Sequence, residues 1–177
     1  MRTASRIVGV AMLAAMAGPA IALAQGSGAE ARLKQLNITL PADQAPAANF
    51  VNSVQTGKLL FLSGNTPGGQ WPLKGKVGKD LTVEQGYQSA RQAGVIMLSK
   101  MRTALGSLDR VKRIVKVLGM VNSADGFSDQ PRVVNGFSDL MVEVFGEAIG
   151  KHARSAVGMA GLPGNAPVEV EMIVEVE

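Results

Sequence analysis

The segment Val168–Glu177 alternates between apolar and acidic residues more regularly than any other part of the chain. One face carries Val168, Val170, Met172, Val174 and Val176, and the other carries Glu169, Glu171, Ile173, Glu175 and Glu177. A period of two residues is that of a β-strand with one face buried and the other in water. The chain is therefore predicted to build a β-sheet whose apolar face is covered by a second layer.

A β-hairpin and a long helix are predicted in the first half of the domain. The apolar runs 50–55 and 58–63 flank the turn Thr56-Gly57, which is typical of a hairpin. Residues 64–80 are rich in Gly and Pro and predict a loop. Thr82 and Gln85 form a capping box that begins a helix running to about Leu105.

The second half of the chain again alternates strands with a helix. A strand is predicted over 111–121, and a helix from about Arg132 to Ile149, with Asp129 near its cap and Gly150 at its end. Two strands follow over 153–160 and 168–176. The order ββαβαββ predicts an α+β sandwich, one mixed sheet with two helices packed on one face. We expect the other face to bind further copies of the chain.

The first 24 residues have the pattern of a secretory signal peptide. Arg2 and Arg6 precede an apolar run, 7–24, that ends in the small-x-small cleavage site Ala22-Leu23-Ala24. The run is also near the minimum length of a membrane anchor, which is the alternative. We expect an exported protein, periplasmic or secreted, with no membrane segment after cleavage. The rest is divided into a loosely tied N-terminal arm, 25–46, and a domain, 47–177.

Charge and composition argue against several classes of function. Removing residues 1–24 takes away two arginines and no acid, so 18 Lys+Arg become 16 against 14 Asp+Glu, and the net charge falls from +4 to +2. A chain this close to neutral, with few aromatic residues, is not expected to bind nucleic acid. It contains no Cys, and His152 is its single histidine. We therefore expect no metal and no cofactor.

The glycine-rich loop 64–80 contains two features that suggest a ligand. Gly75-Lys76 looks like part of a phosphate-binding loop, but the spacing is wrong and Val77 stands where Ser or Thr is required. Trp71 is interpreted as an anchor of the loop, with stacking on a ligand as the alternative.

Arg154, near the start of the strand 153–160, is the strongest chemical clue. A guanidinium on a strand is a rigid fork of donors for a carboxylate or a phosphate. Glu169, on the following strand, can orient a water or a proton. If the two strands form a simple hairpin about Gly164, Arg154 faces Val174 and lies about 16 Å along the strand from Glu169. The two groups could then meet only across a subunit boundary.

At this point the chain resembles the Rid family, the reactive-intermediate imine deaminases also called YjgF-like or L-PSP endoribonuclease-like proteins. The resemblance extends over about 47–177, and its motifs occur in the family's order. They are Gly57-Lys-Leu-Leu-Phe-Leu-Ser-Gly64, Leu105-Gly-Ser-Leu-Asp-Arg-Val111, 115–121, Val134-Asn135, Ala153-Arg-Ser155, Leu162-Pro163 and Val168-Glu-Val-Glu171.

The resemblance implies a chorismate-mutase-like fold and a homotrimer with small-molecule clefts between subunits. It implies that Arg154 binds a substrate carboxylate, that Glu169 positions a water as the catalytic group, and that Asn135 lies in the cleft. Phe50 stands where the family has a Tyr, and Ala156 where a Cys is frequent, so the chain is a divergent member.

Three functions follow as expectations from the resemblance. The first is hydrolysis of 2-imino or 2-enamino acids to 2-oxo acids and ammonia. The second is binding of small carboxylates by a non-catalytic trimer. The third is an endoribonuclease activity, which the near-neutral charge disfavours. Export also separates the protein from the cytoplasmic enzymes that usually generate imines, and this favours binding or an unidentified substrate.

Overall fold

The computed structural model describes residues 28–177 of the 177-residue chain. The predicted signal peptide, 1–24, lies outside the described residues. In the part that is described, no helix has both the length and the apolar character needed to cross a bilayer.

The order of the main elements is the predicted ββαβαββ. The described residues form helices and strands in the order α1 (Ala29–Gln35), β1 (Ser53–Thr56), β2 (Leu59–Asn65), α2 (Val83–Leu105), a 3-10 turn (Leu108–Arg110), β3 (Val111–Asn122), α3 (Gln130–Phe145), α4 (Glu147–Gly150), β4 (Ala153–Met159), a second 3-10 turn (Pro163–Asn165) and β5 (Val168–Val176).

The five strands form one mixed sheet in the order β1-β2-β5-β3-β4, as the α+β prediction requires. β4 runs parallel to β3, and the other neighbours are antiparallel. The simple hairpin considered for the last two strands is not formed, because β3 lies between β4 and β5. A parallel pair needs a crossover, and α3 supplies it between β3 and β4.

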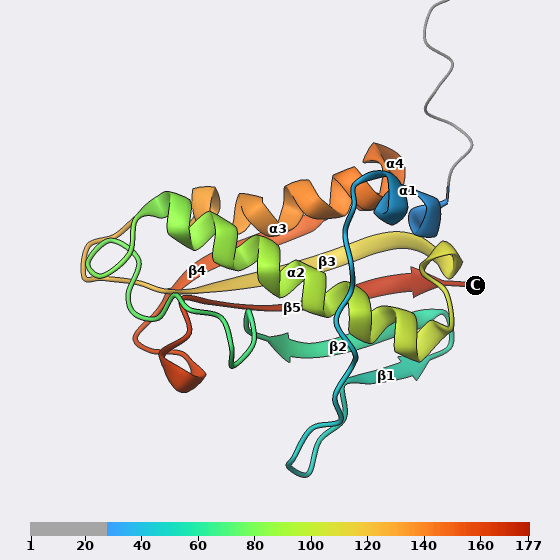
Figure 1. Cartoon of the computed structure of the whole chain (residues 1–177), viewed down its shortest axis with the longest axis horizontal. Coiled ribbons are helices and arrows are strands. Elements are labelled where there is room, and N and C mark those ends of the chain that lie inside the picture. The colour runs from blue at the N-terminus through green and yellow to red at the C-terminus, as the bar shows by residue number, and fades with distance from the viewer. Residues whose placement is uncertain (1–27) are drawn as a thin grey trace, which may run out of the picture.

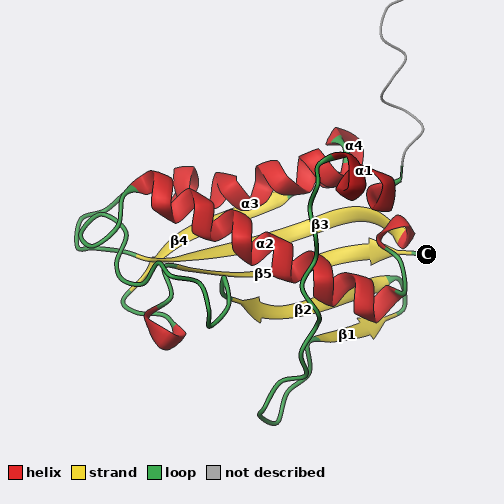
Figure 2. Cartoon of the chain, in the orientation of Figure 1, coloured by secondary structure: helices red, strands yellow, loops and turns green. Residues whose placement is uncertain are grey.

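The helices α2 and α3 lie together across one face of the sheet, and the opposite face is uncovered (Figures 1 and 2). The predicted capping box is present: Thr82 accepts from the N–H of Gln85, and the Gln85 side chain accepts from the N–H of Thr82. The core lies between the helices and the sheet. Met97 and Met101 of α2 are fully buried in it, as adaptable apolar side chains.

The second helix is shorter than predicted. α3 ends at Phe145, and Gly146, with a φ of 77°, separates it from the single turn of α4. A left-handed backbone conformation is readily adopted by glycine and cannot continue a right-handed helix. The apolar periodicity runs through this break, so it predicted one helix where there are two.

Residues 28–46 are attached more firmly than their composition suggests. Leu33 of α1 is 2% exposed and belongs to the core. Further along, the Ser99 hydroxyl of α2 donates to the carbonyl of Pro41 at 2.6 Å. The segment therefore packs along α2, and the description of a loosely tied arm does not fit the described part of it.

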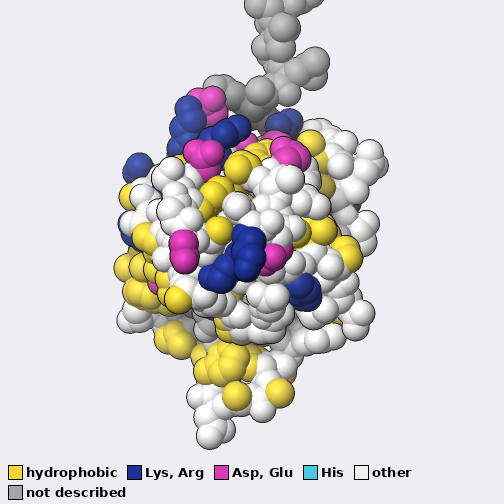
Figure 3. Space-filling view, turned by 90° about the vertical axis from the view of Figure 1, so that its left-hand side faces the viewer, with side chains coloured by type: hydrophobic (Ala, Val, Ile, Leu, Met, Phe, Trp, Pro, Cys, Tyr) yellow, Lys and Arg dark blue, Asp and Glu magenta, His cyan; other side chains and the backbone are white. Residues whose placement is uncertain are grey.

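The uncovered face of the sheet carries exposed apolar side chains. Val54, Phe61, Ile173 and Lys116 form one row across β1, β2, β5 and β3. Val54 is 57% and Phe61 40% exposed. Figure 3 views the sheet from one end, with the uncovered face toward the left, where apolar side chains gather. Water-exposed apolar side chains in such number mark an interaction surface.

Candidate functional site

Arg154 and Glu169 lie on opposite faces of the sheet. Arg154 is paired in register with Val117 of β3, which is buried under the helices. Glu169 is paired with Met120 of the same strand. Side chains alternate along a strand, and positions three residues apart point to opposite faces. Within one chain the two groups therefore cannot contact the same small ligand.

The guanidinium of Arg154 is held by helix α3. Its Nη1 donates to Asn135 Oδ1 and to Ser138 Oγ, each at 2.9 Å, and its Nη2 donates to the carbonyl of Pro131 at 3.3 Å. A guanidinium has five N–H donors, so two remain free for a ligand. Among residues 28–177, Arg154 forms no ion pair. Arg154 and Asn135, which the family resemblance singled out separately, thus lie in direct contact.

His152, two residues before Arg154 in the chain, also supports this arrangement. Its Nδ1 lies 2.7 Å from the carbonyl of Gly150, and its Nε2 lies 3.0 Å from Ser138 Oγ. A carbonyl can only accept, so the proton is on Nδ1, and Nε2 accepts from the Ser138 hydroxyl. Burial, and then the charge of Arg154, lower the pKa of His152, although the bond to Gly150 opposes them. The neutral histidine thus leaves the Ser138 oxygen free to accept from Arg154.

Glu169 and Phe50 line a second region, a cleft of about 640 Å³. Its walls come from α2, the loop after β2 and the chain before β1, and include Gly64, Trp71, Ile96 and Lys100. Phe50 is 56% exposed at this cleft and brings no hydroxyl to it. The structure therefore groups Glu169 with Phe50, and Arg154 with Asn135, in two separate half-sites.

The carboxyl group of Glu169 is half-buried, and it is packed against the backbone of Gly64. A Cβ atom at Gly64 would overlap the Glu169 Oε1 atom, so any larger residue there would displace the Glu169 carboxyl group. In the part of the chain that the structure covers, no donor or cation binds this carboxyl group. Burial, and secondarily the charge of Glu171, raise the pKa of Glu169. The group is therefore poised to take up or release a proton closer to neutral pH than an ordinary glutamate.

Replacing Glu169 by Gln should stabilise the protein at pH 7. Because the folded-state pKa is raised, the stability that Glu169 contributes is present below about pH 4.5 and is lost as the pH rises through the folded pKa. The melting temperature of Glu169→Gln should therefore exceed that of the wild type at pH 7, and the difference should close below about pH 4.5. Asp125→Asn, at an exposed turn, serves as the control. A lower melting temperature for Glu169→Gln at pH 7 would contradict the burial of an unpaired charge.

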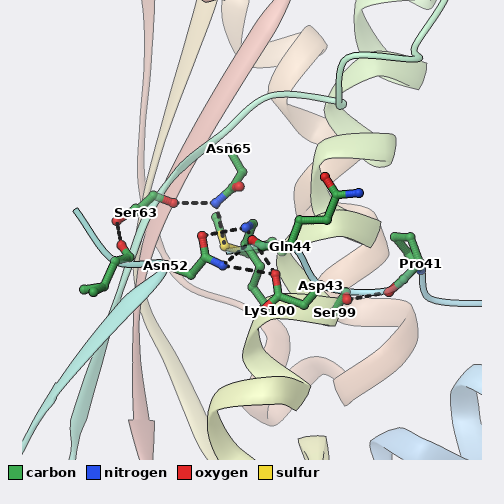
Figure 4. A network of polar contacts seen from close by, with 10 residues as sticks. Pro41, Asp43, Gln44, Asn52, Ser63, Asn65, Ser99 and Lys100 are labelled. Atoms are coloured by element: carbon green, nitrogen blue, oxygen red, sulfur yellow. Dashed lines mark hydrogen bonds and ion pairs between the residues drawn. The ribbon is translucent and has the colours of Figure 1, made fainter. Parts of the chain in front are cut away.

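Figure 4 shows the polar contacts of a buried lysine, which also lines the cleft. Lys100 of α2 donates to Asn52 Oδ1 at 2.6 Å and to Asp43 Oδ1 at 3.3 Å, and it is 9% exposed. The Asn52 amide in turn donates to Asp43 Oδ1 and to the carbonyl of Gln44. These bonds tie the segment 41–52, which we call the strap, to α2.

The side chains of Trp71 and Lys76 both form hydrogen bonds within the protein. The indole N–H of Trp71 donates to Ser89 Oγ at 2.9 Å, which confirms that Trp71 anchors the loop, although one side of the residue still lines the cleft. The Lys76 ammonium donates to the carbonyls of Ser123 and Ala160. Over residues 28–177, no group of three or more His, Cys, Asp or Glu side chains is arranged to hold a metal.

Several supporting residues were missed by the sequence analysis. Ser138 lies three residues after Asn135, which places both on one face of α3. That spacing was a usable signal once a helix was predicted there. Gly64, Asp43 and Lys100 carried no such signal, because their partners are distant in the chain and only the packing brings them together.

The chain matches a family model described as "YjgF/chorismate_mutase-like, putative endoribonuclease" over residues 30–176. Protein TCP17 of Trypanosoma cruzi is 48% identical over 149 residues, covering 82% of this chain and 92% of that protein. Among solved structures, the chain is similar to Atu1372 from Agrobacterium tumefaciens, a protein of unknown function, with 41% identity, a TM-score of 0.76, and coverage of 84% of this chain and 91% of that one.

A second solved structure is that of a "putative endoribonuclease" from Shewanella oneidensis MR-1. It is 31% identical, with a TM-score of 0.80, and the match covers 85% of this chain and all of that one. The match of the family model to most of the chain, the shared order of elements and the mixed sheet agree with one another. The chain belongs to the YjgF/chorismate-mutase-like family.

Proposed function

We propose that this protein binds small carboxylate ligands in clefts between protomers of a homotrimer, and that it hydrolyses 2-imino or 2-enamino acids there. The observation that carries the proposal is the state of Arg154. Its guanidinium is oriented by Asn135, Ser138 and Pro131, yet it has no acidic partner among the described residues and keeps two donors free. A preoriented, uncompensated guanidinium is suited to bind a carboxylate bidentately.

The opposite placement of Arg154 and Glu169 supports a site shared between protomers. One chain cannot bring both groups to one ligand, but a head-to-tail ring can place Arg154 of one protomer beside Glu169 of the next. The exposed apolar row that includes Val54 and Phe61 is a suitable surface for such an assembly. An aspartate at Phe61 should then yield a monomer. A monomer with full activity would contradict the shared site.

The chemistry in such a cleft would need no group other than side chains and water. Arg154 would hold the carboxylate of the imino acid, and Glu169 of the adjacent protomer would take a proton from a water that adds to the imine carbon. With the protonated imine as substrate, this addition gives a neutral carbinolamine. Glu169 returns the proton to its nitrogen, and the C–N bond breaks as the hydroxyl proton passes to the Glu169 carboxylate, which releases ammonia and leaves a 2-oxo acid. Burial within its own protomer raises the pKa of Glu169, and the guanidinium of the adjacent Arg154 opposes that shift once the site is assembled.

Arg154→Ala is expected to reduce kcat/KM and ligand affinity about 10- to 100-fold, because a charge-assisted bidentate interaction is lost. The measurement is ammonia release from imino acids generated in situ by an amino-acid oxidase. Arg132→Ala is a matched control, since Arg132 is exposed and its ion pair with Asp129 is local. Ammonia release at the background rate, unchanged by Arg154→Ala, would exclude the deaminase and leave the binding function.

A mixing experiment tests the shared site directly. Arg154→Ala and Glu169→Gln should each keep at most about a tenth of wild-type activity, but a refolded equimolar mixture should regain about a quarter of it, because one interface in four then pairs two intact groups. No recovery from well-formed mixed trimers would rule out a site divided in this way.

The binding function is the second candidate, and the missing hydroxyl at Phe50 favours it. It predicts that a 2-oxo acid raises the melting temperature of the wild type but not of Arg154→Ala, with no turnover. Export of the mature protein to the periplasm or outside the cell is also a proposal. It is tested by N-terminal sequencing of the mature protein, with Gln25 expected as the first residue.

A further inference from the structure

We propose that the cleft beside Glu169 receives an apolar side chain of the ligand, so that the preferred carboxylate is one with a long aliphatic or aromatic group. This inference rests on the proposed function for the carboxylate end of the ligand. It concerns the opposite end, and it depends on side chains that come from a single protomer.

The walls of the cleft are predominantly apolar. Trp71 and Ile96 face it from the loop and from α2, with Pro41, Phe50, Pro67 and Pro163 around them. A volume of about 640 Å³ is in the range of sites for organic ligands and exceeds what a carboxylate alone requires. An apolar cleft of this size binds best a group that removes its surface from water.

The cleft is also preformed. The bond from Trp71 to Ser89 fixes the indole, and the loop beneath it is so close to α2 that a Cβ at Gly68 would lie 3.0 Å from Ile96 Cδ1. On the other side, the contacts of Lys100 hold the strap in place. Walls that are ordered before binding lower the entropic cost of binding.

The charges in the cleft determine which end of the ligand enters. Three charged side chains line it, Asp43, Lys100 and Glu169. Lys100 and Asp43 form an ion pair at 3.3 Å, with side chains 10% and 13% exposed, so they compensate each other. Glu169 has no cation within its own protomer, so it repels a carboxylate from the interior of the cleft. The carboxylate therefore stays outside, toward Arg154 of the adjacent protomer, and the apolar group lies inside.

The test is a series of stable 2-oxo acids of increasing length, from pyruvate to 2-oxooctanoate, with phenylpyruvate as the aromatic member. Affinity measured by isothermal titration calorimetry should increase about fourfold for each added methylene until the cleft is filled. Affinities that do not depend on chain length would overturn the inference.

Variants of α2 should change this dependence on length. Ile96→Ser removes an apolar wall and should reduce the gain per methylene, whereas Gln92→Leu, one turn earlier on the same wall, should increase it. Leu36→Ser is the matched control: Leu36 is 37% exposed and does not line the cleft, so the dependence should stay as in the wild type. The gain per methylene is a ratio within one variant, so a general loss of stability does not alter it.

Arg154→Ala separates the two proposals. If it weakens every member of the series by the same factor and the gain per methylene persists, both proposals stand. If it changes no affinity while the gain persists, the carboxylate role of Arg154 is wrong and the apolar cleft stands. If Arg154→Ala weakens binding but chain length has no effect in the wild type, the cleft inference alone fails.

Discussion

Lys100→Met is expected to lower the free energy of unfolding by about 3 kcal/mol or more, the usual effect of breaking a buried ion pair. Methionine keeps the length and the apolar packing of the lysine stem but leaves the Asp43 carboxylate without its cation. The Asp43 side chain is 13% exposed, so water can replace the lost partner only in part. Urea unfolding at pH 7 measures the change.

The matched control is Lys112→Met. Lys112 pairs with Glu177 at 2.6 Å, a shorter contact than that of Lys100, but the two side chains are 53% and 51% exposed. A solvated pair contributes little to stability, so this variant should be close to the wild type. Adding Asp43→Leu to Lys100→Met should recover part of the loss. An equal effect of the two lysine variants would show that burial does not set the energy of the Lys100 pair.

Hydrogen exchange gives a second readout of Lys100→Met. The strap 41–52 is tied to α2 through Lys100 and through the Ser99–Pro41 bond. Loss of Lys100 should accelerate exchange in the strap more than in β3 or β5, which do not depend on it. Lys100→Met should also reduce the gain in affinity for each methylene added to the ligand, because the strap is a wall of the cleft.

Gly136→Ala is expected to destabilise the protein by about 3 kcal/mol. Helices α2 and α3 approach closely at this point, and a Cβ at Gly136 would overlap the backbone carbonyl of Tyr87. A backbone atom cannot rotate away, so the two helices must separate and the core between them must open. The loss should appear although alanine favours a helix by about 1 kcal/mol over glycine. Thermal and urea unfolding give the measurement.

Two other glycines form a graded control. At Gly94, also between the helices, a Cβ would lie 2.8 Å from Leu140 Cδ2, a side-chain atom that can move, so Gly94→Ala should cost less. A Cβ at Gly161 would have no other residue within 4 Å beyond its chain neighbours, and the position is exposed. Gly161→Ala should therefore hardly change the free energy of unfolding. If Gly136→Ala were as stable as Gly161→Ala, the close contact of the helices would be incorrect.

The elements that could be predicted from sequence are those with local causes. The capping box at Thr82, the period of two in β5 and the glycine turn at Gly57 each depend on a few neighbouring residues. The break at Gly146 was missed because the apolar period continues on both sides of it. The hairpin considered for the last two strands is not formed, because strand order depends on distant partners. Sequence neighbours often pair, but here α3 carries the chain across β3.

The same distinction applies to the candidate site. Arg154 and Glu169 were singled out from the strand pattern, and Asn135 and Phe50 from the family resemblance. The sequence also indicated that Arg154 and Glu169 would not meet within one chain. The reason is different from the predicted one: the two side chains lie on opposite faces of the sheet rather than far apart along one hairpin. The supports of each group, Ser138 for Arg154 and Gly64 for Glu169, became visible only in the packed structure.

The sequence by itself determined the α+β class, the element order and the amphipathic strand Val168–Val176, because propensity, capping and periodicity act over a few residues. Tertiary structure alone decided that this strand lies at the centre of the sheet between β2 and β3. It also decided that the Glu169 end of the strand meets an apolar cleft whose walls come from α2, a glycine-rich loop and the strap. Contacts between residues tens of positions apart depend on how the elements pack, and no local pattern encodes them.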